Sequence, residues 1–313
     1  MATISIPNPA PSAIEDAEKL RKAFQGWGTD EMTMIDVLAH RNAAQRKQIK
    51  IVYEEQYEEK LLKRIESEIS GHFERAVYLW IFDPVERQAI MANIAIESKV
   101  FDFPVIIEIA CVNSPNELLA VKQVYQSLYK RSLEEDVASH TTGDFCKLLF
   151  ALVGTYRYDG EEINTELANT EAKILNDAIT KGQFNDNEII RILSTRSKAQ
   201  LNTTFNCYKD AQNRSITKAL STETPNDFAI VLRAAIRCMN NPKKYFDKVF
   251  RRTLQKSGTD EDTLTRLVLT HAEKDLKEIK ELFQTRTNMT LEQAVAKKTS
   301  GDYKNFLLAL IGN

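Results

Sequence analysis

Hydrophobic residues recur at helical spacing along almost the whole chain. Within the first eighty residues, apolar positions three or four apart form five groups, which lie at 14–24, 34–38, 49–53, 61–69 and 73–80. Residues 1–13, with prolines at 7, 9 and 11, predict an irregular lead-in, and Asp83-Pro84 marks the end of the unit. The pattern therefore predicts a module of five short helices.

The module recurs in one ungapped register. Offsets of 72, 83 and 75 residues carry Phe73 to Phe145, Phe228 and Tyr303. The same offsets carry the apolar Leu38 to three further apolar positions, which are Ala110, Leu193 and Val268. A repeated module of this size indicates an array of repeats rather than unrelated domains. We predict an all-α protein of four repeats of about 70 residues, at 14–84, 85–157, 158–240 and 241–313.

Composition narrows the possible partners. Ten glycines and eight prolines in 313 residues are few, which favours helices and short turns. The 44 acidic and 42 basic residues leave a net charge of −2, which argues against a nucleic-acid binder. The same balance would not draw the protein to an anionic membrane without a bridging cation.

The cysteines and the ends of the chain suggest an intracellular setting. The four cysteines are widely spaced and form no zinc or disulfide pattern. The first twelve residues lack the charged and apolar regions of a signal peptide, and no apolar run has the length of a membrane span. We expect a cytoplasmic protein.

Candidate chemistry lies in one loop, Phe24-Gln25-Gly26-Trp27-Gly28-Thr29-Asp30. Its two glycines permit positive φ, so the carbonyls of Phe24, Gly26 and Gly28 could point toward one cation. The distant Glu68 could add two carboxylate oxygens. Calcium takes six to eight oxygens, which would leave part of the shell open to a lipid phosphate. The alternative is an ordinary helix start, in which Thr29 caps the helix that follows.

The register separates these two interpretations. Gly28 maps to Val100, Gln183 and Gly258, and Glu68 maps to His140, Glu223 and Lys298. Only the first repeat combines two glycines with the acid, and selective loss elsewhere favours a ligand role over a role in the fold. The counterparts in the fourth repeat are Leu254, Lys256, Gly258 and Lys298. A second site there is doubtful, because an ammonium group replaces the carboxylate.

The four helical repeats, the Gly26-Trp27-Gly28-Thr29-Asp30 loop and the acid forty residues after Gly28 resemble the annexin family over about residues 14–312. Trp27 and the degenerate second and third repeats look like plant annexins. The resemblance implies a slightly curved disc with calcium loops on its convex face. It also implies reversible, calcium-dependent docking on anionic phospholipid membranes, with Phe24, Gly26, Gly28 and Glu68 as the metal ligands.

Trp27, at the tip of the loop, is a candidate membrane contact. An indole ring suits the lipid interface, and glycines on both sides suggest exposure. Packing of the ring against a neighbouring helix is the alternative.

Other features of plant annexins leave two further hypotheses open. His40, or the pair Cys111 and Cys238, could serve a peroxidase-like redox enzyme, although a partly buried histidine and buried free thiols explain them as well. Ile190-Arg191-Ile192 matches a tripeptide linked in the family to actin, so a scaffold for actin or other proteins is the second hypothesis. The chain contains no GxxxxGK[ST] phosphate loop, and we expect no dedicated active site.

Overall fold

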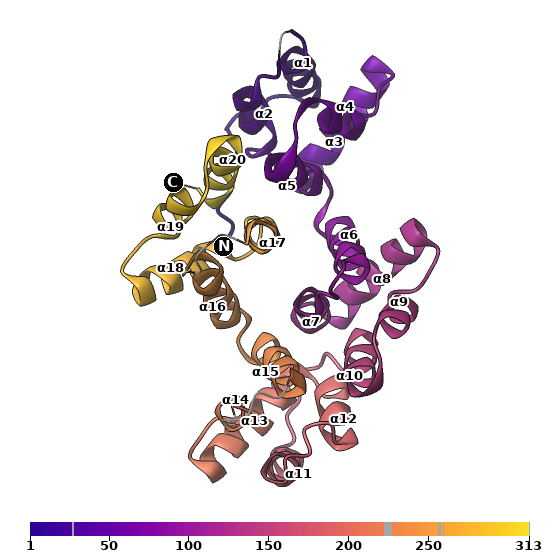
Figure 1. Cartoon of the computed structure of the whole chain (residues 1–313), viewed down its shortest axis with the longest axis vertical. Helices are drawn as coiled ribbons and strands as arrows, with labels where there is room; N and C mark the ends of the chain where they lie inside the picture. The colour runs from indigo at the N-terminus through magenta and orange to yellow at the C-terminus, as the bar shows by residue number, and fades with distance from the viewer. Residues whose placement is uncertain (27, 222–226, 256–257, 259, 313) are drawn as a thin grey trace. The chain divides into compact units, whose positions relative to one another are not determined.

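The computed structural model describes residues 1–26, 28–221, 227–255, 258 and 260–312. This part of the chain contains twenty helices and no strand (Figure 1). It divides into two compact units, residues 1–87 with 246–313, and residues 88–245. Among the helices described, none has both the length and the apolar character needed to cross a membrane.

The first unit contains the first repeat and most of the fourth. The first repeat consists of α1 (Ala13–Ala23), α2 (Glu31–Leu38), α3 (Ala43–Tyr57), α4 (Leu61–Glu68) and α5 (Gly71–Ile81). The fourth consists of α16 (Pro242–Gln255), α17 (Glu261–His271), α18 (Leu276–Thr287), α19 (Leu291–Lys298) and α20 (Gly301–Ile311). Helix α5 packs against both α17 and α20, where the rings of Phe73 and Phe306 meet edge to face at 5.9 Å. The two repeats therefore share one core.

The second unit contains most of the second repeat and the third. These repeats consist of α6 (Pro84–Glu97), α7 (Phe103–Val112), α8 (Pro115–Tyr129), α9 (Leu133–His140) and α10 (Gly143–Val153), followed by α11 (Thr165–Thr180), α12 (Asn187–Thr195), α13 (Lys198–Gln212), α14 (Ile216–Ala219) and α15 (Asp227–Asn240). Helix α7 packs on α15 and α10 packs on α12. The rings of Phe145 and Phe228, which share a register position, lie 5.7 Å apart.

The backbone carries the same register as the sequence. Only four described residues other than glycine have positive φ, and each ends the third helix of its repeat: Glu58, Lys130, Asn213 and Asn288. They are spaced by 72, 83 and 75 residues, the offsets predicted from the apolar pattern. The register position of Leu38 is buried in all four repeats. The prediction of an all-α chain with four five-helix repeats is confirmed.

Trp80 anchors the core of the first unit. It is fully buried, and its indole nitrogen donates to the carbonyl of Leu38 at 2.8 Å. The guanidinium groups of Arg46 and Arg87 lie 3.8 and 4.6 Å from the centre of its ring, and both approach the carboxylate of Glu273. These contacts join the first and fourth repeats through a buried, charge-paired cluster.

Candidate metal site in the first repeat

The glycine loop joins α1 to α2 and is tied at both ends. At the end of α1, the amide of Phe24 donates to the carbonyl of Leu20, and Phe24 itself is buried. At the other end, the amide of Asp30 donates to the carbonyl of Ala23 at 2.9 Å. Between these bonds Gly26 and Gly28 are exposed and have φ of 125° and 95°. Side chains other than hydrogen rarely allow these angles, so the glycines set the path of the loop.

Asp30, rather than Thr29, caps α2, so the prediction that Thr29 is the cap is wrong. The Asp30 carboxylate accepts from the amide of Thr33 at 3.0 Å. The Thr29 hydroxyl instead donates to Glu68 Oε2 at 2.7 Å. Asp30 therefore caps the helix, and Thr29 bonds the loop to the distant Glu68.

Helix α4 brings Glu68 to the loop. Leu61 and Ile65 are buried and anchor one face of this short helix, and Glu68 is its last residue. Arg64, one turn earlier, points its guanidinium between the helix and the loop. A single nitrogen, Arg64 Nη2, donates to the Phe24 carbonyl at 2.5 Å and to Glu68 Oε1 at 2.7 Å. Two of the four predicted ligands are therefore brought to one cationic atom.

The two oxygens that meet at this point are of the kind that calcium prefers. A neutral carbonyl and a carboxylate already face a common positive charge, and both are hard oxygen donors of the kind that calcium prefers. Gly26 and Gly28 supply the loop backbone beside them. Trp27 lies outside the described residues, so its predicted place at the tip stays a prediction.

The described part of the fourth-repeat loop shares two features with the first repeat and differs in one charged side chain. Gly258 has φ of 94°, and the Asp260 carboxylate accepts from the amide of Thr263 at 3.0 Å, as in the first repeat. Leu254 is buried. Lys298 is the last residue of α19, where Glu68 is the last residue of α4. Lys256 lies outside the described residues.

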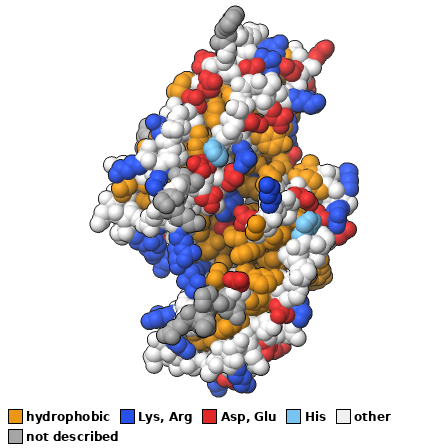
Figure 2. All heavy atoms as spheres, in the orientation of Figure 1, with side chains coloured by type: hydrophobic (Ala, Val, Ile, Leu, Met, Phe, Trp, Pro, Cys, Tyr) orange, Lys and Arg blue, Asp and Glu red, His pale blue; other side chains and the backbone are white. Residues whose placement is uncertain are grey.

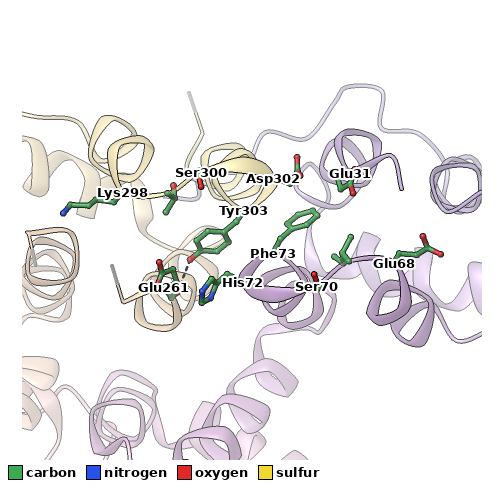
Figure 3. Close-up of a pocket in the computed structure, with 12 residues that line it drawn as sticks. Glu31, Glu68, Ser70, His72, Phe73, Glu261, Lys298, Ser300, Asp302 and Tyr303 are labelled. Atoms are coloured by element: carbon green, nitrogen blue, oxygen red, sulfur yellow. Dashed lines mark hydrogen bonds between the residues drawn. The ribbon is translucent and has the colours of Figure 1, made fainter. Parts of the chain in front are cut away.

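A polar pocket of about 410 Å³ separates these two helix ends within the first unit (Figure 3). Many of the residues that line the pocket form pairs that are 230 positions apart in the sequence, among them Glu31 with Glu261 and Phe73 with Tyr303. Glu68 and Lys298 lie at opposite ends and extend away from each other (Figure 3). The two candidate sites are therefore separate places rather than one shared centre.

The residues of the redox hypothesis lie elsewhere. His40 Nδ1 is 2.8 Å from the carbonyl of Ser5, in the lead-in segment. Cys111 and Cys238 are free and buried in the second unit. Burial raises the pKa of Cys111 to about 11 and holds the pKa of Cys238 well above its usual value. A raised pKa disfavours the thiolate, which is the reactive form of cysteine.

The tripeptide of the actin hypothesis is part of the core of α12. Ile190 and Ile192 are buried. Arg191 is partly exposed and bonds the carboxylate of Glu188 at 2.8 Å. The two isoleucines are thus explained by packing, and actin binding stays a hypothesis.

Acidic and basic side chains are both spread over the parts of each unit that Figure 2 shows, in keeping with the net charge of −2. On this face neither unit is covered by charge of one sign.

Comparison with known proteins agrees with this architecture. The annexin family model matches residues 15–80, 88–152, 170–235 and 245–310. Annexin-like protein RJ4 of Fragaria ananassa is 58% identical over 312 residues, covering all of this chain and 99% of the relative, and annexin Gh1 of Gossypium hirsutum is 49% identical at the same coverage. The solved structure of annexin III superposes with a TM-score of 0.92 at 30% identity, covering 100% of this chain and 97% of that one. Calcium-bound annexin (Sm)1 superposes with a TM-score of 0.84 at 27% identity, covering 100% and 93%. With four matched repeats and relatives this similar along its full length, the chain belongs to the annexin family.

Proposed function

We propose that this protein docks reversibly on anionic phospholipid membranes through a calcium ion held in the first repeat. The observation that carries the proposal is the meeting of the Phe24 carbonyl and the Glu68 carboxylate at one cationic nitrogen. Membership of the annexin family, whose members bind phospholipid in a calcium-dependent manner, supports it.

Each residue has a distinct role in this proposal. Phe24, Gly26 and Gly28 offer backbone carbonyls, and Glu68 offers the only charged ligand. Thr29 orients that carboxylate through its 2.7 Å hydrogen bond to Oε2. A bound calcium ion would link these oxygens to a lipid phosphate and supply the attraction that the net charge of −2 lacks.

The other repeats serve mainly as scaffold in this proposal. We assign their bounds as 14–84, 85–157, 158–240 and 241–313, and we assign no calcium site to the fourth, where Lys298 replaces the acid. The protein would be cytoplasmic and peripheral on membranes when calcium rises. Because burial disfavours both thiolates, we do not propose the thiol-based redox activity.

Glu68→Gln tests the proposal directly. Neutralising the carboxylate removes both its charge and its second oxygen as ligands. We expect the fold to survive, because the second and fourth repeats do without this acid. We expect the calcium concentration for half-maximal sedimentation with phosphatidylserine vesicles to rise by at least about tenfold, which is about 1.4 kcal/mol. Glu66→Gln is the matched control, since Glu66 is exposed on the same helix.

Unchanged sedimentation of Glu68→Gln at every calcium concentration would contradict the proposal. An equal loss in Glu66→Gln would also contradict it, because the effect would then follow the charge of α4 and not a ligand.

A further inference from the structure

We propose that Arg64 is an internal competitor of calcium, which must leave the first-repeat site before the ion binds. This inference rests on the proposed function, since it concerns how that same site is regulated. Four observations carry it: the position of the guanidinium, a second acid within its reach, a buried guanidinium nitrogen without a partner, and the absence of the arginine from the other repeats.

The guanidinium and a calcium ion cannot share the site. Arg64 Nη2 is 2.5 Å from the Phe24 carbonyl oxygen and 2.7 Å from Glu68 Oε1. Calcium binds its oxygens at about 2.3–2.6 Å, so an ion coordinated by both atoms would overlap this nitrogen. The two positive charges would also repel each other strongly at that separation. Binding of the ion is therefore an exchange of one cation for another.

Glu59 offers Arg64 a second carboxylate with which to form an ion pair. Its Oε1 is already 3.8 Å from Arg64 Nη1, the terminal nitrogen that does not make the Glu68 contact. The other oxygen, Oε2, is held by Arg21 at 2.6 Å and by the Tyr53 hydroxyl at 3.0 Å, which fixes the carboxylate in position. A modest movement of the long arginine side chain would exchange Glu68 for Glu59 and keep its charge paired.

The hydrogen bonding of the Arg64 guanidinium at the loop is also incomplete. Its Nε is buried and has no hydrogen-bond partner among the described residues. A buried donor without a partner makes this position of the side chain less favourable than a position in which every donor is bonded. The arginine is held by the two bonds from Nη2, by a looser approach of Nη1 to Glu59 at 3.8 Å and by the ring of Phe24 at 5.9 Å, while Nε stays unpaired among the described residues. This partly bonded position suits a group that leaves when a stronger cation arrives.

Only the first repeat has this competitor. The register places Asp136, Ala219 and Ala294 at the position of Arg64. In the second repeat the charges are reversed, because Arg131 stands at the position of Glu59 and pairs with Asp136 at 2.7 Å. The arginine therefore accompanies the one repeat that keeps both the glycines and the acid, where it lowers the calcium affinity and holds the empty loop in place.

Arg64→Met tests the inference, with Lys63→Met as its matched control. Both remove one positive charge from the same turn of α4, but Lys63 is exposed. We expect Arg64→Met to lower the calcium concentration for half-maximal sedimentation with phosphatidylserine vesicles by about tenfold, and Lys63→Met to change it less than about twofold. In chelator, hydrogen exchange of the peptide covering residues 24–30 should quicken in Arg64→Met alone, because the loop loses its bond to Arg64.

Glu59→Gln tests where the arginine goes. In the unmodified chain it should raise the calcium requirement several-fold, because the displaced guanidinium loses its second partner. In the Arg64→Met background the same change should have little effect. A cycle of the four proteins isolates this coupling from the loss of the Arg21 and Tyr53 contacts.

Failure of the inference is distinguishable from failure of the proposed function. If Glu68→Gln abolishes calcium-dependent sedimentation but Arg64→Met leaves it unchanged or weakens it, the site stands and the competitor is refuted. If Glu68→Gln has no effect, the site itself is refuted. Equal effects of Glu59→Gln in both backgrounds would refute the movement to Glu59.

Discussion

At the loop positions that the structure describes in both, the first and fourth repeats share their backbone features and differ in the charge that the fourth helix brings. Gly28 and Gly258 have φ of 95° and 94°, and Asp30 and Asp260 cap the next helix through equivalent bonds of 3.0 Å. Yet one repeat ends its fourth helix on Glu68 and the other on Lys298.

In the proposed function, the shared glycine and helix cap do not by themselves make a calcium site. A repeat can keep the positive-φ glycine and the aspartate cap without binding a cation, because both also serve to begin a helix. The charged residue brought from the fourth helix decides whether a cation is attracted or repelled. At about 4 Å and an effective dielectric constant of about 20, each pair of unit charges contributes on the order of 4 kcal/mol, so exchanging an acid for a lysine dominates the difference.

Lys298→Asp would break the comparison by giving the fourth repeat an acid. We expect a second calcium site, seen as a higher calcium stoichiometry and a shift of half-maximal vesicle binding to about tenfold lower calcium. Lys297→Asp, one residue earlier on α19, is the control for charge alone. An equal shift in both variants would show that bulk charge, and not a ligand position, separates the repeats.

Gly28→Ala and Gly258→Ala would sharpen the comparison by separating the shared backbone features from the ligand. An added Cβ meets no atom within 4 Å at either position, so the cost comes from positive φ alone, about 1–2 kcal/mol in the free energy of unfolding. Denaturant unfolding should show similar losses for both variants. Vesicle binding should weaken in Gly28→Ala only, and equal weakening in Gly258→Ala would mean that the fourth repeat also binds the membrane.

Substitution of Trp27 has the smallest expected effect, which is measured by tryptophan fluorescence. It has no aromatic counterpart in the fourth repeat, where the register places Ser257. The other tryptophan, Trp80, is fully buried and reports only on the core. Calcium with phosphatidylserine vesicles should move the emission to shorter wavelength, and Trp27→Ala should abolish the shift. A shift that persists with Trp80 alone would show that the core, not the loop, changes on binding.

The fold could be predicted from the sequence because it is repeated. Four copies of one apolar pattern reinforce each other, and the positive φ of Glu58, Lys130, Asn213 and Asn288 falls in the same register. The helix start at the loop was misplaced by one residue, since Thr29 and Asp30 are both good caps. What decided between them was a tertiary contact, the bond from Thr29 to Glu68, which local spacing does not contain.

The site could be predicted only in part. Comparison of the repeats singles out Glu68 as a candidate ligand, because only the third repeat keeps an acid at the same register position. Arg64 was missed, although its i, i+4 spacing to Glu68 is the usual spacing of a helical ion pair. Its contact with the Phe24 carbonyl joins residues forty positions apart, and no local pattern reveals that one nitrogen reaches both.

Calcium titration by calorimetry of the unmodified protein, beside Glu68→Gln, tests the central claim most directly. The account predicts one strong site in the unmodified chain and its loss in Glu68→Gln. Two strong sites of similar affinity, or a single strong site that survives Glu68→Gln, would contradict it.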